Sequence, residues 1–380
     1  MSPNFKCHWK FSGQKPIWNI DRRRHPTRPT SGERRAQLAH RRAASHRPPV
    51  GRRSLGFRRT PVRAGPAVLK LLGHRLLWSL PVVFVATALS FVLTGLVPGD
   101  AALTMLGPRA TPDQVVALRE SLGLDKPILE QYGSWLAHAV RGDLGTSIFS
   151  GEVISTRLNQ HVEVTLSLLI LGTLASAVLG LALGITSAVR GGATRSIVDV
   201  LSLGGMAIPN FWLAVVLTSF FSVAFRIFPV AGYVSFADSP GQWARSLVLP
   251  VTALAVGAAT VIAKQTRDSV GQVLNQDFIK TLRANGLSNR SILFRHALRN
   301  AGVPIMSIIG VVFVGLIGGT IFVEQVFAMP GLGSIVQQAT AAQDLPLIQG
   351  AVVYFTLLVV AANLLVDLCY GAIDPRVRVR

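Results

Sequence analysis

The chain has 380 residues, of which 50% are hydrophobic and only 15% charged, so it is too apolar for a soluble globular protein of this size. Its formal net charge is +20, but residues 1–66 alone hold 14 Arg and 3 Lys against 2 acidic residues, which leaves only +5 for the rest. The charge therefore belongs mostly to an N-terminal segment and does not mark the whole chain as a nucleic-acid binder. Cys7 and Cys369 offer no disulfide framework and no metal-ligand spacing.

Residues 1–66 are rich in Arg, Pro, Ser and Gly and show no hydrophobic periodicity, which predicts a disordered tail. The tail is not a signal peptide, because no apolar core follows within the usual ~30 residues. Three interpretations compete: an arm held by anionic lipid, an arm that binds nucleic acid, or residues included only because the start codon is assigned too early.

Six apolar runs follow, each long enough to cross a hydrocarbon core of about 30 Å. They are Leu76–Val97, Val164–Val189, Leu201–Phe225, Leu247–Ala263, Val303–Val323 and Ile348–Val366. Among the short loops, 190–200 has two basic residues and 264–302 has seven, whereas 226–246 has two and 324–347 has none. The excess of basic residues in cytoplasmic loops predicts that 264–302 and both termini lie in the cytoplasm.

The long polar segment 98–161, between the first two runs, is predicted to be an extracytoplasmic helical insert. Thr111 can cap a helix with Pro112 at its first position and Gln114 completing a capping box, and Gly123 ends that helix. A second helix begins near Pro127 and stops before Gly142.

The segment Asp277–Pro304 is basic and helix-forming, and it joins two apolar runs. A short helix over Asp277–Asn285 is expected to end at Gly286, which can supply the left-handed residue that commonly closes a helix. Ser288 can cap a second helix, Asn289–Asn300, before Pro304 opens the next apolar run. The pattern predicts a cytoplasmic docking site, and the alternative is an amphipathic helix lying on anionic lipid.

Two further stretches carry special residues. Pro209 should bend the third span and free a carbonyl, while Asn210, beside Phe211 and Trp212, can meet polar solute or water; a kink packed within the bundle is the alternative. After the fifth span, Pro330, Gly331 and Gly333 predict a turn. Small residues are dense in the second and fifth spans, which predicts close helix packing there: Gly172, Ala175, Gly180 and Gly184, then Gly310, Gly315, Gly318 and Gly319.

The sequence has no Gly-x-x-x-x-Gly-Lys-Ser/Thr loop, so the chain itself is not expected to be an ATPase. None of the six runs contains Asp, Glu, Lys or Arg, which weighs against proton coupling. His161 and Glu163 are expected at the membrane interface, and Asp367 is expected to cap a helix, pair with a cation or reach the interface.

Several phrases resemble, in order, the ABC importer permeases of the DppB/OppB-like (dipeptide, oligopeptide and nickel) family. ANGLSNRSILFRHALRNAGVP is similar to the EAA loop of those permeases, although Lys280, Thr281 and Leu282 stand where the general motif has Glu-Ala-Ala. The other matching phrases are PGDAA, LGLDKP, QYGSWL, RGDLGTS, IPNFWLA, EQVFAMPGLGSIVQQA and NLLVDLCYGAIDPRVRVR. The resemblance covers residues 68–380, and it favours a start codon assigned too early as the explanation of residues 1–66.

The resemblance implies an all-α integral membrane fold of six transmembrane helices, with a permease domain over residues 67–380, in the inner membrane. It implies a second homologous permease, two cytoplasmic ATPases that bind the ATP, and an extracytoplasmic substrate-binding protein; this chain would bind no cofactor, metal or nucleic acid. The coupling residues would be Lys280, Thr281, Arg283, Ala284, Gly286, Leu287, Arg295 and His296. The path or gate residues would be Pro209, Asn210, Phe211, Trp212, Glu324, Pro330 and Gly331.

The expected solute is a peptide or similar small molecule; dipeptides, longer peptides, glutathione and nickel chelates all stay open. An ion-coupled secondary transporter is the main alternative, and it should show intramembrane charges and internal repeats. An intramembrane hydrolase or a membrane-anchored nucleic-acid binder would need paired catalytic residues in the spans or an essential basic arm.

Overall fold

The computed structural model describes residues 65–96, 101–107, 109–121 and 123–373. These residues all belong to one compact unit, Arg63–Arg380. The predicted N-terminal tail, apart from its last two residues, and the C-terminal phrase from Asp374 onward lie outside the described residues.

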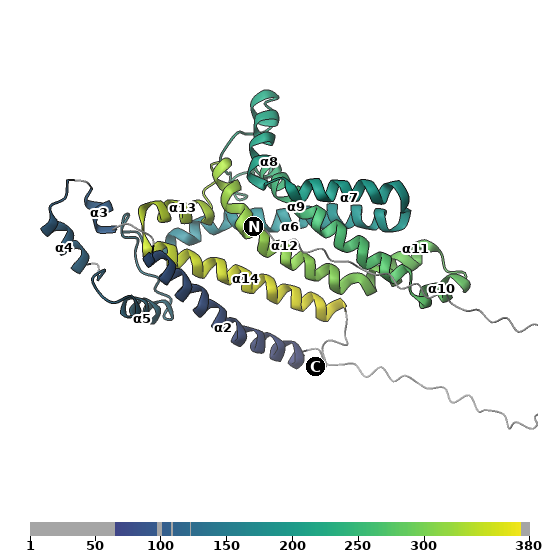
Figure 1. Cartoon of the computed structure of the whole chain (residues 1–380), viewed down its shortest axis with the longest axis horizontal. Coiled ribbons are helices and arrows are strands. Elements are labelled where there is room, and N and C mark those ends of the chain that lie inside the picture. Colours follow the sequence, from purple (N-terminus) through teal and green to yellow (C-terminus); the bar gives the residue numbers. More distant parts are fainter. Residues whose placement is uncertain (1–64, 97–100, 108, 122, 374–380) are drawn as a thin grey trace, which may run out of the picture. The chain divides into compact units, whose positions relative to one another are not determined.

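Long helices make up most of the described part, which contains no strand, only an isolated bridge between Thr146 and Val153. The longest are α2 (Gly65–Leu96), α6 (Ile154–Arg190), α9 (Pro240–Leu274), α12 (Leu298–Val326) and α14 (Leu345–Ile373) (Figure 1). By length and composition, five helices of the described residues could cross a membrane, and a bent helix pair could form a sixth span. The all-α membrane fold predicted from the sequence is therefore confirmed.

The third span is broken rather than merely bent. The predicted run Leu201–Phe225 falls on α7 (Gly192–Ala207), α8 (Asn210–Leu217) and the π-helical η1 (Thr218–Ala224), and the two halves meet at 94°. Ile208 is extended, with φ −85° and ψ 119°, because the ring of Pro209 disfavours helical backbone in the preceding residue. The kink predicted at Pro209 is confirmed, and the apolar run that contains it forms two helical halves that can together make one span.

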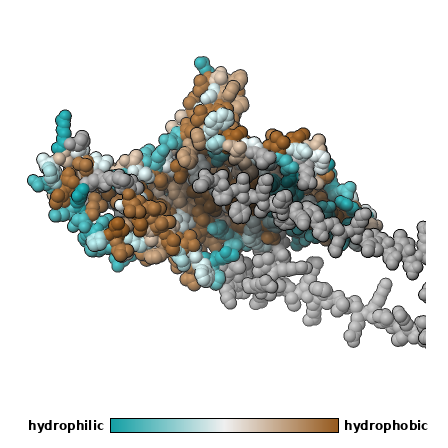
Figure 2. Space-filling model, viewed as in Figure 1, coloured by the Kyte–Doolittle hydropathy of each residue, from teal (hydrophilic) through white to brown (hydrophobic). Residues whose placement is uncertain are grey.

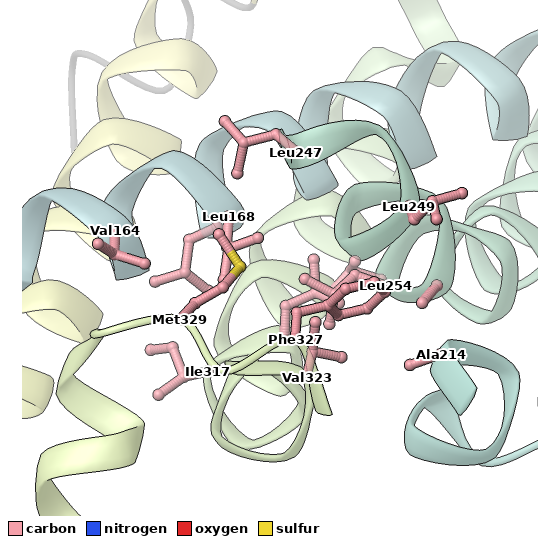
Figure 3. Packing of buried hydrophobic residues seen from close by; sticks show 14 of the residues in the cluster. Val164, Leu168, Ala214, Leu247, Leu249, Leu254, Ile317, Val323, Phe327 and Met329 are labelled. Carbon is pink, nitrogen blue, oxygen red and sulfur yellow. The ribbon is translucent and has the colours of Figure 1, made fainter. Parts of the chain in front are cut away.

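The core is formed where α6, α9 and α12 pack together, with α8 at its edge (Figure 3). The close approach of α6 to α9 depends on glycine: a Cβ at Gly180 would lie 2.8 Å from the Ala259 carbonyl oxygen, and one at Gly184 would lie 2.6 Å from that of Ala263. Small residues allow backbones to approach this closely, as predicted for the second span. In the fifth span Gly310 packs tightly on Val366, whereas Gly315 and Gly318 face open space.

Helices α2 and α14 lie side by side (Figure 1). The Nε atom of Arg75 lies 3.1 Å from Oδ2 of Asp367, so Asp367 pairs with a cation, as one of its predicted roles required. One turn further along α14, the hydroxyl oxygens of Tyr370 and Ser307 are 2.5 Å apart, which links α14 to α12.

The insert between the first two spans contains α3 (Ala101–Leu106), α4 (Pro112–Ser121) and α5 (Ile128–Ala139). The predicted capping box is confirmed: the Gln114 N–H donates to Thr111 Oγ1 (3.4 Å) and the Thr111 N–H to Gln114 Oε1 (3.1 Å). Gly123 has φ +68°, which stops α4 as expected. Helix α3 was not predicted, since six residues are too few to show periodicity.

Apolar side chains also cover much of the outer surface, as Figure 2 shows over α8. Exposed examples on α8 and η1 are Phe211, Trp212, Val215, Phe220 and Val223, and α2 exposes Leu77, Trp78 and Phe84. Such surfaces are expected of helices that face lipid or other membrane subunits.

Candidate coupling and gate sites

The coupling segment begins with α10 (Asp277–Ala284), which is anchored by a single apolar side chain. Ile279 is fully buried, while its neighbours Asp277, Phe278 and Lys280 are exposed. Helix α10 contacts the π-helical η2 (Ile292–Ala297), where Ile292 and Ala297 are also buried. The apolar side of α10 therefore holds it to the bundle, and its polar side is left free.

The turn after α10 has the predicted chemistry. Gly286 has φ +77°, and the N–H of Leu287 donates to the Leu282 carbonyl at 3.2 Å, which closes the helix. Ser288 caps the next helix, since its Oγ accepts the N–H of Ser291 at 3.3 Å. A Cβ at Gly286 would meet no atom within 4 Å, so only the left-handed backbone calls for glycine here.

The second predicted helix, Asn289–Asn300, does not end before Pro304. Instead α11 (Asn289–Ser291), η2 and α12 run on as one apolar helix from Asn289 to Val326, with Pro304 inside it. The expectation that Pro304 opens a separate run was wrong. A membrane helix can continue through a proline when its neighbours satisfy the freed carbonyl.

The predicted coupling residues lie mostly on the surface. Lys280, Thr281, Arg283, Ala284, Gly286 and Arg295 are exposed, and Leu287 and His296 are half-buried. Lys280 Nζ lies 2.8 Å from Asp277 Oδ1, but both side chains are open to solvent, so the pair adds little stability. Phe294, which the sequence reasoning passed over, is 59% exposed in η2. The sequence feature that could have indicated Phe294 is an aromatic residue between two basic residues, Arg290 and Arg295, both of which are exposed.

The first group of predicted path residues lies at the break in the third span. Asn210 opens α8, and its side chain lies between two glycine backbones: a Cβ at Gly257 would lie 3.4 Å from its Oδ1, and one at Gly319 would lie 2.9 Å from its Nδ2. The ring of Phe211 is 6.2 Å from that of Phe322, and Trp212 is 52% exposed.

Glu324, near the end of α12, is fully buried and has no cation beside it among the described residues. Its Oε1 accepts the Thr165 hydroxyl at 2.7 Å, and its Oε2 accepts the N–H of Ser334 at 3.0 Å. Ser334 is in the first turn of α13 (Leu332–Ala342), where free N–H groups and the helix dipole favour a negative charge. Thr165 Oγ1 in turn accepts the Leu332 N–H at 2.8 Å.

The predicted turn at Pro330 and Gly331 makes room for this carboxylate. A Cβ at Gly331 would clash with the Glu324 carboxyl group, and one at Gly333 would lie 2.8 Å from Glu324 Oε2. Among the described residues, no hydrogen bond or ring contact joins the two predicted path groups. Both adjoin the same end of α12, through Gly319 and Phe322 for the α8 group and through Glu324 for the turn.

A third polar cluster, centred on Tyr233, was not predicted. The Tyr233 hydroxyl donates to Glu163 Oε1 at 3.0 Å and accepts the Trp243 indole N–H at 3.1 Å, and burial raises the pKa of Tyr233. Tyr233 and its two partners come from three separate segments, so no local sequence pattern predicts the cluster. No group of three or more His, Cys, Asp or Glu that could hold a metal occurs among the residues described.

Two family models match the chain. The model described as "Binding-protein-dependent transport system inner membrane component" matches residues 180–379, and its N-terminal companion matches residues 68–168. The first covers the coupling segment, Glu324 and the break at Pro209.

The alignment with each of three curated relatives covers nearly the whole length of that relative. A putative peptide transport system permease protein of Brucella abortus is 40% identical over 81% of this chain and 98% of its own. A probable peptide ABC transporter permease of Sinorhizobium fredii is 39% identical over 80% and 98%. The glutathione transport system permease GsiC of Salmonella choleraesuis is 35% identical over 80% and 97%.

A structure of the MetNI methionine ABC transporter is similar at a TM-score of 0.47, with 20% identity over 57% of this chain and 96% of that one. The family match and the relatives agree with the all-α membrane fold and with the motifs along the sequence. The chain thus belongs to the binding-protein-dependent transport system inner membrane components and is a multi-pass ABC importer permease of the DppB/OppB-like type.

Proposed function

We propose that this permease forms one half of the path through which a peptide or a similar small solute is imported, with a second homologous permease forming the other half. Membership of the family implies ATPase and substrate-binding partners in general. The proposal adds that two ATPase subunits bind and hydrolyse the ATP in the cytoplasm, and that one of them docks on Asp277–Pro304. Relatives named for peptide and glutathione transport support the solute class.

The exposed polar side of α10, held from behind by buried Ile279, is the observation that carries the docking proposal. Lys280 and Arg283 are open to solvent on a helix that has little contact with the rest of the chain beyond η2. A basic surface on a fixed helix can pair with an acidic cleft of a partner and set its register. Phe294, also exposed, is the kind of aromatic side chain that is enriched at interfaces.

Helix α12 offers the mechanical link from this site to the gate. The helix from Asn289 to Val326 begins beside α10 and carries Gly319, Phe322 and Glu324 at its far end. When the ATPases close on ATP, movement of α10 and η2 would be passed along this helix to the break at Asn210 and to the turn before α13. That shift would turn the path from inward to outward facing. The chain itself performs no bond chemistry.

The orientation of the chain in the membrane is part of the same proposal. With the coupling segment in the cytoplasm, both termini lie there too, and the insert 98–161 lies outside, where the substrate-binding protein would meet the pair of permeases. The distribution of basic residues over the loops supports this arrangement.

Co-purification tests the docking. The chain would be expressed with the ATPase and permease genes that neighbour its own and extracted in detergent, as wild type, as Gly286→Pro and as a Lys280→Glu, Arg283→Glu double variant. We expect wild type to retain the ATPase and both variants to lose about tenfold or more of it, where about 1.4 kcal/mol accounts for each factor of ten. In the double variant like charges would now face each other across the interface, and in Gly286→Pro the proline ring cannot adopt the positive φ that closes α10.

The matched control is an Arg109→Glu, Arg141→Glu double variant, which reverses two exposed charges in the insert. This control should retain the ATPase. If the ATPase binds wild type and all three variants alike, the coupling segment is not the docking site; if it binds none of them, the energy source assigned here is wrong.

A further inference from the structure

A cavity of about 460 Å³ lies between the segment that joins η1 to α9 and the first turns of α9. Its lining includes two cationic side chains, Arg226 and Arg245, together with Tyr233, Gln242 and Ser246. The lining contains no Asp or Glu. The cavity is therefore a concave site with a net positive charge, separate from the coupling segment and from Glu324.

Neither of these two guanidinium groups has a carboxylate partner among the described residues. Three other Arg side chains in the described part each pair with an acid: Arg75 with Asp367, Arg157 with Glu152, and Arg267 with Asp199. Arg245 uses one N–H, donating from Nη2 to the Ile227 carbonyl at 2.9 Å. An arginine has five N–H donors, so both cations keep most of their hydrogen-bonding capacity.

The backbone at the cavity is fixed in an unusual conformation. Arg226 has φ +54°, in the left-handed region that a long side chain rarely adopts. The next residue holds it there, since the Ile227 N–H donates to the Phe221 carbonyl at 2.9 Å and the Ile227 carbonyl accepts from Arg245. Strained positions of this kind are concentrated at functional sites, where the surrounding structure maintains them.

The positions of Arg226 and Arg245 along the chain also favour an external site. They are the only Lys or Arg in the loops 226–246 and 324–347, both of which are expected on the outside. Although they stand at opposite ends of the first loop, they reach the same cavity. The wall of that cavity is tied to the gate region, because the Gly232 N–H donates to the Phe327 carbonyl at 2.8 Å, in the turn between α12 and α13.

We propose that this cavity binds a carboxylate group of the solute as it enters the path from outside. The guanidinium groups of Arg226 and Arg245 supply the charge-assisted hydrogen bonds that carboxylates favour, and the amide of Gln242 supplies a neutral donor. The wall that holds the solute is joined by the Gly232–Phe327 backbone hydrogen bond to the turn that carries Pro330 and Gly331. This inference rests on the importer function and solute class proposed above.

Protection from an arginine-specific reagent tests it. The complex of the full chain with its partner permease and ATPases, in neutral-lipid nanodiscs, would be treated with phenylglyoxal, and modification of each Arg would be quantified by mass spectrometry. We expect Ala-Ala or glutathione to lower the labelling of Arg226 and Arg245 about threefold, as two-thirds occupancy gives by mass action. Ala-Ala amide should give no protection, and Arg141, exposed in the insert, should label equally throughout.

Variants separate a binding role from a structural one. Arg226→Gln should abolish protection of Arg245 by Ala-Ala, Arg226→Lys should restore part of it, and both should still co-purify with the ATPase. Inorganic phosphate and nanodiscs that contain phosphatidylglycerol are the competing probes. If either probe protects the two arginines and neither carboxylate solute does, the site is one for phosphate or lipid headgroups and the inference is wrong.

Absence of protection by every probe also overturns the inference. The two proposals fail separately: a wild-type complex that retains its ATPase but shows no protection loses only the carboxylate site. A wild-type chain that retains no ATPase contradicts the importer function itself.

Discussion

At the scale of single residues, Glu324 and Thr165 show how a buried carboxyl group is held without a cation among the described residues. Glu324 accepts from Thr165 and from the first turn of α13, and Thr165 also accepts from Leu332. Thr165→Val removes one hydroxyl that serves both groups and leaves a buried carboxylate oxygen and a buried N–H without a partner. We expect a loss of about 1–3 kcal/mol of stability, measured as a lower midpoint of thermal unfolding in detergent.

Thr186→Val is the matched control for Thr165→Val, because Thr186 is on the same helix, is exposed and bonds only carbonyls of its own preceding turn. This control should shift the midpoint little. Equal shifts for the two variants would show that the Thr165 hydroxyl does not anchor α13.

At the scale of elements, the seam between α6 and α9 and the open side of α12 predict opposite outcomes for one chemical change. A methyl group at Gly184 would meet the Ala263 carbonyl oxygen and the Thr266 side chain at 2.6 Å, whereas one at Gly315 would meet nothing within 4 Å. Gly184→Ala should therefore destabilise the chain by about 1–3 kcal/mol through overpacking. Gly315→Ala should stabilise it by about 0.5–1 kcal/mol through the helical preference of alanine.

Thermal unfolding of the isolated chain in detergent measures both variants, since Gly315 can face a partner in the assembled importer. Because the two variants are expected to change stability in opposite directions, each serves as the control for the other. Two losses of similar size would mean that α12 is packed on both sides. Two neutral results would mean that α6 and α9 separate easily at this seam.

Elements of the fold that depend on neighbouring residues were predictable from the sequence, and contacts between distant segments were not. The capping box of Thr111 and the cap at Ser288 follow from residues three positions apart, and the closure at Gly286 follows from the backbone freedom of one glycine. Glu324 was named from a motif, but its partner Thr165 lies in another span, which no local pattern reveals. Pro304 misled because a membrane helix can continue through a proline where its neighbours satisfy the freed carbonyl, whereas local rules treat the proline as a boundary.

At the scale of the whole molecule, charge separates a basic N-terminal segment from the permease. Residues 1–66 carry a net +15 of the +20 total, and the family match begins at residue 68. We expect a chain that starts at residue 67 to assemble with the ATPase and to take up solute within about twofold of the full chain, because at ~0.15 M salt the field of a charged segment is screened beyond about 8 Å. A Lys280→Glu, Arg283→Glu variant of the shortened chain should still lose the ATPase. Loss of assembly or uptake on deletion alone would instead show that the basic arm takes part in transport.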